Sequence, residues 1–222
     1  MEYKLKIMAI DQPTLETKRL VVVKPKDFKF IPGKSINVSI PKPGLENQSK
    51  AIAITSPNSD YYFELIFKEF RRDKFDEALN NLRAGEEIVV SDITGNIEYK
   101  GRGVFIAYET GILPFISIFR ELKQDDLING NVLMYSTKNR SDLILERELK
   151  HIFGGKNVMF LLSREKAAGY EQRRLDLNFL KEKINDFNQE FYIAGPENFV
   201  NEIRTALLSL GAQSLNTELI EQ

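Results

Sequence analysis

Two apolar runs of the sequence end in side chains that could bind a phosphate group. Ser163 and Arg164 follow the run 158–162, and the polar residues 138–140, Lys-Asn-Arg, follow the run 132–135. A hydroxyl and a guanidinium at the end of a buried strand can hold a ribose phosphate, because the guanidinium offers two parallel N–H donors to an anion. A loop arginine that contacts only water is the simpler alternative at each position.

Two further apolar runs lead directly into helix starts. Residues 104–107 are all apolar, which predicts a strand buried on both faces, and Thr110, Gly111 and Pro114 then introduce a helical pattern. The stretch 191–196, Phe-Tyr-Ile-Ala-Gly-Pro, has the same order of strand, glycine and proline. Such turns point free backbone N–H groups beyond the strand ends, where open α/β sheets bind nucleotides. The convergence of these features favours a dinucleotide site.

The composition of the 222-residue chain excludes several kinds of chemistry. It contains no cysteine, and therefore no disulfide, no thiolate nucleophile and no cysteine-ligated iron–sulfur cluster. His151 is the only histidine, so a multi-histidine metal site is excluded and we expect no metal. The formal net charge of −1 argues against a nucleic acid or an anionic membrane as partner. Any redox chemistry must therefore use a non-covalent organic cofactor.

The sequence carries no visible targeting or membrane signal. Glu2 lies at the N-terminus with no long apolar core after it, and the longest apolar stretch is found around residues 112–119. That stretch is shorter than the roughly 18 residues that a membrane span needs. We therefore expect a soluble, cytoplasmic protein.

The N-terminal half has the pattern of a small all-β unit. Short runs with alternating apolar and polar residues are separated by turns such as Pro32-Gly33 and 41–44, which favours an antiparallel barrel or sandwich. One helix is predicted at 73–82. The six predicted strands are 2–10, 17–24, 35–40, 51–55, 61–68 and 88–90.

The C-terminal half alternates strand and helix, which predicts a parallel sheet covered on both faces. The predicted strands are 104–107, 132–135, 158–162, 191–194 and 212–215, and further helices are expected at 141–151, 176–186 and 197–210. The change of pattern places the boundary near Gly101-Arg102-Gly103. We therefore expect two domains, 1–100 and 101–222.

In combination these features resemble the ferredoxin–NADP reductase-like superfamily, especially its flavodoxin-reductase and flavohaemoprotein-reductase members. The resemblance rests on Phe30-Ile-Pro-Gly33, on residues 103–120, on residues 142–149 and on Ala194-Gly-Pro196. It implies an N-terminal antiparallel six-stranded β-barrel that binds FAD, followed by a C-terminal parallel-sheet α/β domain that binds NADPH or NADH. Hydride would pass from nicotinamide to flavin, and electrons onward to an acceptor protein such as flavodoxin or ferredoxin.

The resemblance also assigns positions to the two cofactors. It places the catalytic positions beside the flavin at Ala53 and Glu218. The flavin contacts it implies are Lys50, Ala51, Ile52, Ala53, Ser56, Phe67 and Lys68. The nicotinamide dinucleotide contacts it implies are Thr110, Gly111, Ile112, Ser136, Ser163, Arg164, Arg174, Gly195, Pro196 and Glu197.

The sequence departs from the family pattern at both cofactor sites. Lys50 replaces an arginine, Ile52 an aromatic ring and Ala53 a hydroxyl residue, and the segment 74–77 brings acid to a phosphate-binding turn. The family's Gly-Gly-Thr-Gly is Tyr-Glu-Thr-Gly at 108–111. A carboxylate there satisfies the helix N-terminus itself and repels a phosphate.

The sequence leaves two main hypotheses open, beside a third in which Tyr108 or the aromatic run 61–63 supplies a replacement stacking surface and alters the flavin or nucleotide preference. The first is an NAD(P)H-dependent flavin oxidoreductase. The second is a reductase-like protein that has kept the fold, has lost flavin or nucleotide binding, and serves as a binding or regulatory module.

Overall fold

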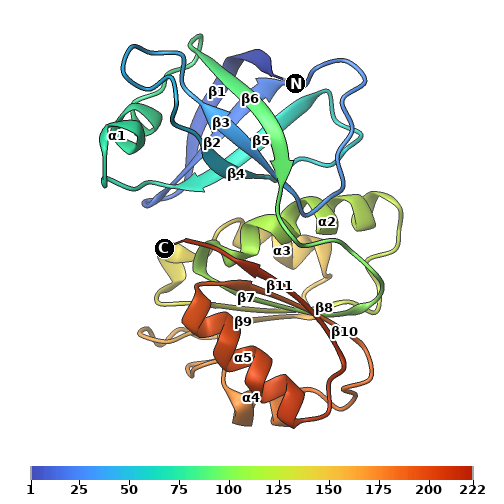
Figure 1. The fold of residues 1–222 in the computed structure, drawn as a ribbon. Coiled ribbons are helices and arrows are strands. Elements are labelled where there is room, and N and C mark those ends of the chain that lie inside the picture. Colours follow the sequence, from blue (N-terminus) through green and yellow to red (C-terminus); the bar gives the residue numbers. More distant parts are fainter. Residues whose placement is uncertain (1, 222) are drawn as a thin grey trace.

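The computed structural model describes residues 2–221, which form two bodies stacked on each other (Figure 1). The upper body in that view is a closed barrel of six antiparallel strands. In spatial order the strands are β1 (Tyr3–Thr14), β2 (Thr17–Val23), β5 (Tyr62–Lys68), β4 (Lys50–Ile54), β3 (Ser35–Ser39) and β6 (Glu87–Thr94), and helix α1 (Lys74–Asn80) lies between β5 and β6 in the chain. The predicted six-stranded barrel is confirmed.

The lower body is a five-stranded sheet in which every neighbouring pair is parallel. Its strands, in spatial order, are β11 (Ser214–Leu219), β10 (Glu190–Gly195), β7 (Gly103–Tyr108), β8 (Val132–Thr137) and β9 (Val158–Leu162). The predicted parallel-sheet α/β unit is therefore confirmed. The sheet grows outward in both directions from β7, so the pair β7 and β10 marks its topological switch point.

Helices cover both faces of this sheet, as Figure 1 shows. Helices α2 (Leu113–Gln124) and α3 (Glu146–Ile152) lie on the face toward the barrel, and α4 (Leu177–Lys183) and α5 (Glu197–Ser209) lie on the opposite face. Two 3₁₀ turns, η1 (Glu109–Ile112) and η2 (Arg140–Asp142), follow β7 and β8. No helix within residues 2–221 has the length and apolar character to cross a membrane.

Two predicted elements begin later than the sequence suggests. The helix predicted at 141–151 starts only at Glu146, because η2 precedes it and Leu145 has the left-handed φ of +54°. The strand predicted at 212–215 is found at 214–219, after a turn in which Gly211 has φ +96°. In both places a residue in the left-handed region delays the next element.

Alternate side chains of β7 contribute to two different cores. Phe105 and Ala107 belong to the cluster on the barrel side, while Val104 and Ile106 belong to the cluster under α4 and α5. This division follows from the two-residue period of a strand, whose successive side chains point to opposite faces. It explains why the run reads as continuously apolar in the sequence.

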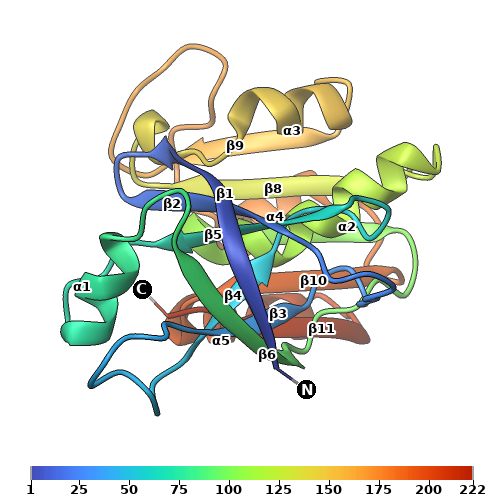
Figure 2. The same cartoon turned by 90° about the horizontal axis from the view of Figure 1, so that it is seen from above.

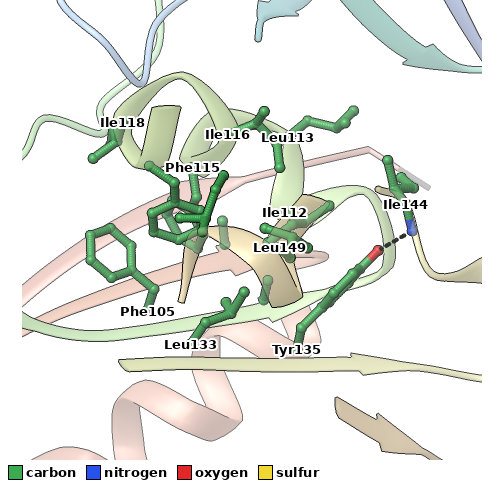
Figure 3. Packing of buried hydrophobic residues seen from close by; sticks show 14 of the residues in the cluster. Phe105, Ile112, Leu113, Phe115, Ile116, Ile118, Leu133, Tyr135, Ile144 and Leu149 are labelled. Carbon is green, nitrogen blue, oxygen red and sulfur yellow. Dashed lines mark hydrogen bonds between the residues drawn. The ribbon is translucent and has the colours of Figure 1, made fainter. Parts of the chain in front are cut away.

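The core between sheet and barrel is drawn in Figure 3. The ring of Phe105 from β7 packs edge-on against Phe115 of α2, with centroids 5.1 Å apart. The hydroxyl of Tyr135 accepts a 3.3 Å hydrogen bond from the backbone N–H of Ile144, and burial raises the pKa of Tyr135. The same cluster includes three residues of the barrel half, which are Ala53, Ile66 and Ile97.

Helix α2 also joins the two bodies through polar contacts. Ser117 Oγ accepts a 3.0 Å hydrogen bond from the backbone N–H of Gly33, whose φ of +98° suits only a residue without a side chain. Arg120 donates to Glu64 Oε1 of β5 at 2.6 Å and to Glu148 Oε1 of α3 at 2.6 Å. Burial opposes its charge, yet Glu148 and Glu64 raise the pKa of Arg120 above the ordinary value.

Removal of the Arg120 charge should destabilise the protein strongly. Arg120→Met removes the partner of Glu64 across the interface, and Glu64, which is 6% exposed, keeps Arg19 at 3.3 Å and the hydroxyl of Thr55. Loss of one partner from a buried ion pair costs up to about 3 kcal/mol. Chemical denaturation would measure the difference in the free energy of unfolding. The matched control is Arg173→Met, because Arg173 pairs with an exposed glutamate, Glu182, and such pairs contribute at most about 1 kcal/mol. Equal losses in the two variants would contradict the role given to Arg120.

Candidate functional site

A cavity of about 640 Å³ lies where the barrel meets the end of the sheet, and we call it the barrel cavity. Its walls come from β4, the end of β5, the start of α1 and the end of β11. In both Figure 1 and Figure 2 α1 and the chain's C-terminal end lie on the same side of the molecule. Eight of the residues expected at the flavin and dinucleotide sites line it: Lys50, Ala51, Ile52, Ala53, Phe67, Lys68, Thr110 and Glu218.

At one end of the barrel cavity the charge of Lys50 is already neutralised by the carboxylate of Asp76. Lys50 Nζ lies 2.9 Å from Asp76 Oδ1, and Asp76 Oδ2 accepts a 3.2 Å hydrogen bond from the backbone N–H of Arg72. The charged groups of Lys50 and Arg72 also lie over the ring of Phe70, at 4.1 Å and 4.2 Å from its centroid. A phosphate that entered here would have to compete with the buried carboxylate of Asp76.

The ring-sized part of the barrel cavity has the opposite character. Ala53, Ile66 and Leu113 give it apolar walls. The hydroxyl oxygens of Thr94 and Thr110 are buried and have no hydrogen-bond partner within residues 2–221. Buried hydroxyls without a partner are costly, so they are a natural match for a ligand with polar atoms on its rim. This end fits a flat, mostly apolar ring system such as a flavin.

Glu218 closes one side of the barrel cavity. Its Oε2 accepts hydrogen bonds from the backbone N–H groups of Asn96, at 2.5 Å, and Ile97, at 3.2 Å. Burial raises the pKa of Glu218 above the ordinary value, although these two bonds and the charge of Lys34 act in the other direction. No aromatic ring follows it, because the next residues are Leu219 and Ile220.

A second cavity, of about 610 Å³, lies at the carboxyl ends of the parallel strands, and we call it the sheet cavity. Five residues expected to contact a dinucleotide line it: Ser136, Ser163, Arg164, Arg174 and Pro196. Lys138 adds a third cation, and the rings of Tyr108 and Phe199, 5.3 Å apart, form an aromatic wall. Arg174 is paired with Glu202 at 3.1 Å, whereas the side chain of Arg164 makes no ion pair within residues 2–221.

Some of the expected site residues lie outside both cavities. Ser56 is fully buried and its Oγ accepts a 3.1 Å hydrogen bond from the backbone N–H of Glu64, while Ile112 is buried in the core and Glu197 is exposed. A side chain on Gly111 would lie 2.1 Å from the carbonyl oxygen of Ala194, so this glycine allows η1 to pack against β10. Gly195 likewise leaves space for Phe199 and Tyr108.

Glu109 lies between the two cavities in an unusual conformation. Its φ is +48°, a left-handed value that costs a residue other than glycine about 1 kcal/mol. Its side chain is 9% exposed and its Oε1 lies 2.7 Å from Lys138 Nζ. This hydrogen bond raises the pKa of Lys138, and burial followed by the charge of Glu109 raises the pKa of Tyr108.

Several lining residues were not singled out as site residues from the sequence. The sequence marks Lys138 only as a cation that follows a strand, and it marks 74–77, which includes Asp76, only as an acidic departure from the family pattern. Thr94 and Phe70 have no sequence signal, because only the closure of the barrel brings them to the cavity.

Comparison with known proteins finds an oxidoreductase family model and a reductase that resemble this chain. Residues 105–205 match the family described as the oxidoreductase NAD-binding domain. The chain is 27% identical over 173 residues to NADH-cytochrome b5 reductase 1 of Eremothecium gossypii, a match that covers 71% of this chain and 60% of that relative. The chain thus spans less than two thirds of the length of that relative.

Solved structures share the whole fold. The FAD/NAD-binding domain of nitric oxide dioxygenase from Vibrio cholerae superimposes with a TM-score of 0.87 at 16% identity, covering 98% of each chain. A ferredoxin NADP⁺ reductase from Neisseria gonorrhoeae, solved with bound FAD and NADP, gives a TM-score of 0.86 at 17% identity, again covering 98% of each chain.

The burial of Glu218 should make stability depend on pH. The pKa of Glu218 is raised in the folded state, so protonation of Glu218 stabilises the folded protein. This stabilisation is lost as the pH rises from the ordinary pKa of 4.5 through the raised pKa. We expect Glu218→Gln to gain stability relative to the wild type across that interval. Thermal unfolding of both proteins at a series of pH values would measure it. A constant difference at all pH values would contradict the prediction.

Proposed function

We propose that this chain, which belongs to the ferredoxin–NADP reductase-like superfamily, is an oxidoreductase that transfers hydride from NADH or NADPH to a bound flavin. The flavin, which we propose to be FAD, would lie in the barrel cavity, and the dinucleotide would lie in the sheet cavity. The domains we propose are 1–100 for flavin and 101–222 for the nucleotide. The observation that carries the proposal is a cavity between barrel and sheet, with apolar walls from Ala53, Ile66 and Leu113, beside a second cavity lined by three cations.

In the barrel cavity the chain's own residues would bind and orient the ring. Thr94 and Thr110 would donate to or accept from its polar rim, and Ala53 and Leu113 would exclude water from its faces. Glu218 keeps Oε2 in two backbone hydrogen bonds, which leaves Oε1 to hold a proton near the ring. A bound flavin would supply the redox chemistry, which is the exchange of a hydride equivalent for single electrons.

In the sheet cavity three cations and two serines would position the dinucleotide. Arg164, Arg174 and Lys138 would contact its phosphates, and Ser136 and Ser163 a ribose. The ring of Tyr108 or Phe199 would offer an apolar surface to a base. Hydride transfer needs no general base from the protein, so positioning of the two rings is the main task of these residues.

The acceptor we propose is a protein that takes electrons one at a time. A flavin converts a two-electron donor into single electrons, which suits a haem, iron–sulfur or flavin partner. One relative found by comparison is named a cytochrome b5 reductase. A flavodoxin or a ferredoxin is the alternative acceptor class that the sequence resemblance implies.

One observation favours a second candidate function. The pair of Lys50 with buried Asp76 places a carboxylate where flavin phosphates would bind. If that pair prevents flavin binding, the chain would be a nucleotide-binding or regulatory module with the same fold. The two functions differ in a property that is easy to measure, which is the visible absorbance of the purified protein.

Neutralisation of Asp76 should strengthen flavin binding. The oxidoreductase proposal predicts a yellow protein, or a colourless one that takes up added FAD. Asp76→Asn keeps the shape and one acceptor oxygen of the side chain, frees the charge of Lys50, and should raise the affinity for FAD about tenfold, or ~1.4 kcal/mol. Quenching of flavin fluorescence on titration would measure it. Asp126→Asn, an exposed carboxylate with φ +57° that asparagine tolerates, is the control. A wild type and a D76N variant that both take up no FAD would favour the module.

Loss of the sheet-cavity arginines should weaken nucleotide binding. We expect the double variant R164Q/R174Q to bind NADPH about tenfold or more weakly, because two charge-assisted contacts with phosphate are lost. Calorimetry with NADPH and NADH in parallel would measure it, and a larger loss for NADPH would place its 2′-phosphate against these side chains. Arg147→Gln, on the exposed surface of α3, is the control and should change neither affinity. Unchanged affinities in the double variant would contradict the assignment of this cavity.

A further inference from the structure

Glu109 connects one lysine from each cavity. Its Oε1 lies 2.7 Å from Nζ of Lys138, which lines the sheet cavity, and its Oε2 lies 3.7 Å from Nζ of Lys68, which lines the barrel cavity. Glu109 itself lines neither cavity. We call this set of three residues the Glu109 bridge.

The backbone around Glu109 separates the two cavities. Tyr108, the residue before it, lines the sheet cavity, and Thr110, the residue after it, lines the barrel cavity. Three consecutive residues therefore lead from one cavity to the other, with the buried carboxylate in the middle. A nicotinamide held by its phosphates in the sheet cavity would have to pass this point to reach a ring in the barrel cavity.

The chain keeps a glutamate where glycine would be less strained. The φ of +48° suits glycine, and a carboxylate on a side chain that is 9% exposed needs partners to offset its lost hydration. Two converging lysines offset the buried charge, while the backbone strain at this position remains. Such local strain at a junction between binding cavities is a sign of a functional position.

We propose that the Glu109 bridge closes the passage between the two cavities and that the pyrophosphate of a bound dinucleotide opens it by competing for Lys138. This inference rests on the proposed function, and it makes Glu109 a residue that determines which ligands reach the barrel cavity. Only a ligand with both phosphates and a nicotinamide would open the passage and use it.

The charges around the bridge are suited to reversible opening. Lys138 faces the same cavity as Arg164 and Arg174, so an incoming phosphate meets it directly. Once Lys138 turns to the phosphate, Glu109 keeps the longer contact with Lys68 and its hydrogen bond with the side chain of Tyr108. Lys68 is also paired with Glu16 at 3.3 Å, so its charge stays matched when Glu109 moves.

The test compares a whole dinucleotide with the half that stays in the sheet cavity. Calorimetry would give the dissociation constants of NAD⁺ and of AMP for the wild type, for Glu109→Gln and for Glu109→Gly. The amide variant keeps the shape and loses the charge, and the glycine variant relieves the left-handed φ and guards against a folding defect in the first. Both variants free Lys138 for a phosphate, and this affects AMP and NAD⁺ alike. The ratio of the dissociation constant of AMP to that of NAD⁺ therefore reports only the effect of the passage on the nicotinamide half.

We expect this ratio to rise at least about fivefold in both variants, and to stay constant in the control Glu182→Gln, whose carboxylate pairs with exposed groups. A ratio that stays within about twofold of the wild type, with AMP still bound, would overturn the bridge and leave the proposed function in place. Absence of AMP and NAD⁺ binding in all the proteins would overturn both.

Discussion

The contact of helix α2 with the barrel is the constraint on which the rest of the structure depends. Arg120 is buried between Glu64 of β5 and Glu148 of α3, and it can keep its charge there only while both carboxylates stay in place. The apolar cluster on the barrel side continues from α2 into the barrel half, so the ion pairs and the packing fix the same geometry. Because the barrel cavity has walls from both bodies, a rotation about this contact would destroy it.

Ionic and hydrogen-bonded contacts hold the interface at several points. Besides Arg120, the contact of Lys68 with Glu109 joins β5 to the turn after β7, and Glu218 of β11 accepts hydrogen bonds from the segment after β6. Each contact pairs a carboxylate with a donor from the other body. Charge pairs of this kind are directional, so they fix the register between the bodies where apolar packing alone would allow sliding. Of the two cavities, the barrel cavity is the one with walls from both bodies, and Lys68 and Glu218 of these contacts line it.

The sequence predicts the fold well because the fold depends on periodicity, and it predicts the site less well because the site depends on contacts. The apolar run 104–107 identifies β7, but nothing in the run reveals that Leu145 or Gly211 will delay a later element. At the site, Ser56 has the residue type expected of a ligand contact, yet its hydroxyl bonds a backbone N–H in the core. Thr94 shows the reverse, an ordinary threonine that barrel closure brings to a cavity with its hydroxyl unpartnered.

The charges of the two cavities differ in a way that bears on the order of binding. In the barrel cavity the cations are already paired, Lys50 with Asp76 and Lys68 with Glu16 and Glu109, so an anion gains little there without displacing a carboxylate. In the sheet cavity Arg164 makes no ion pair within residues 2–221, and an anion can approach it without such a displacement. Under the proposed function, phosphates would be attracted first to the sheet cavity, while the barrel cavity would select its ligand by shape. A ligand with a charged half and a flat half satisfies both conditions when it spans the passage at Glu109.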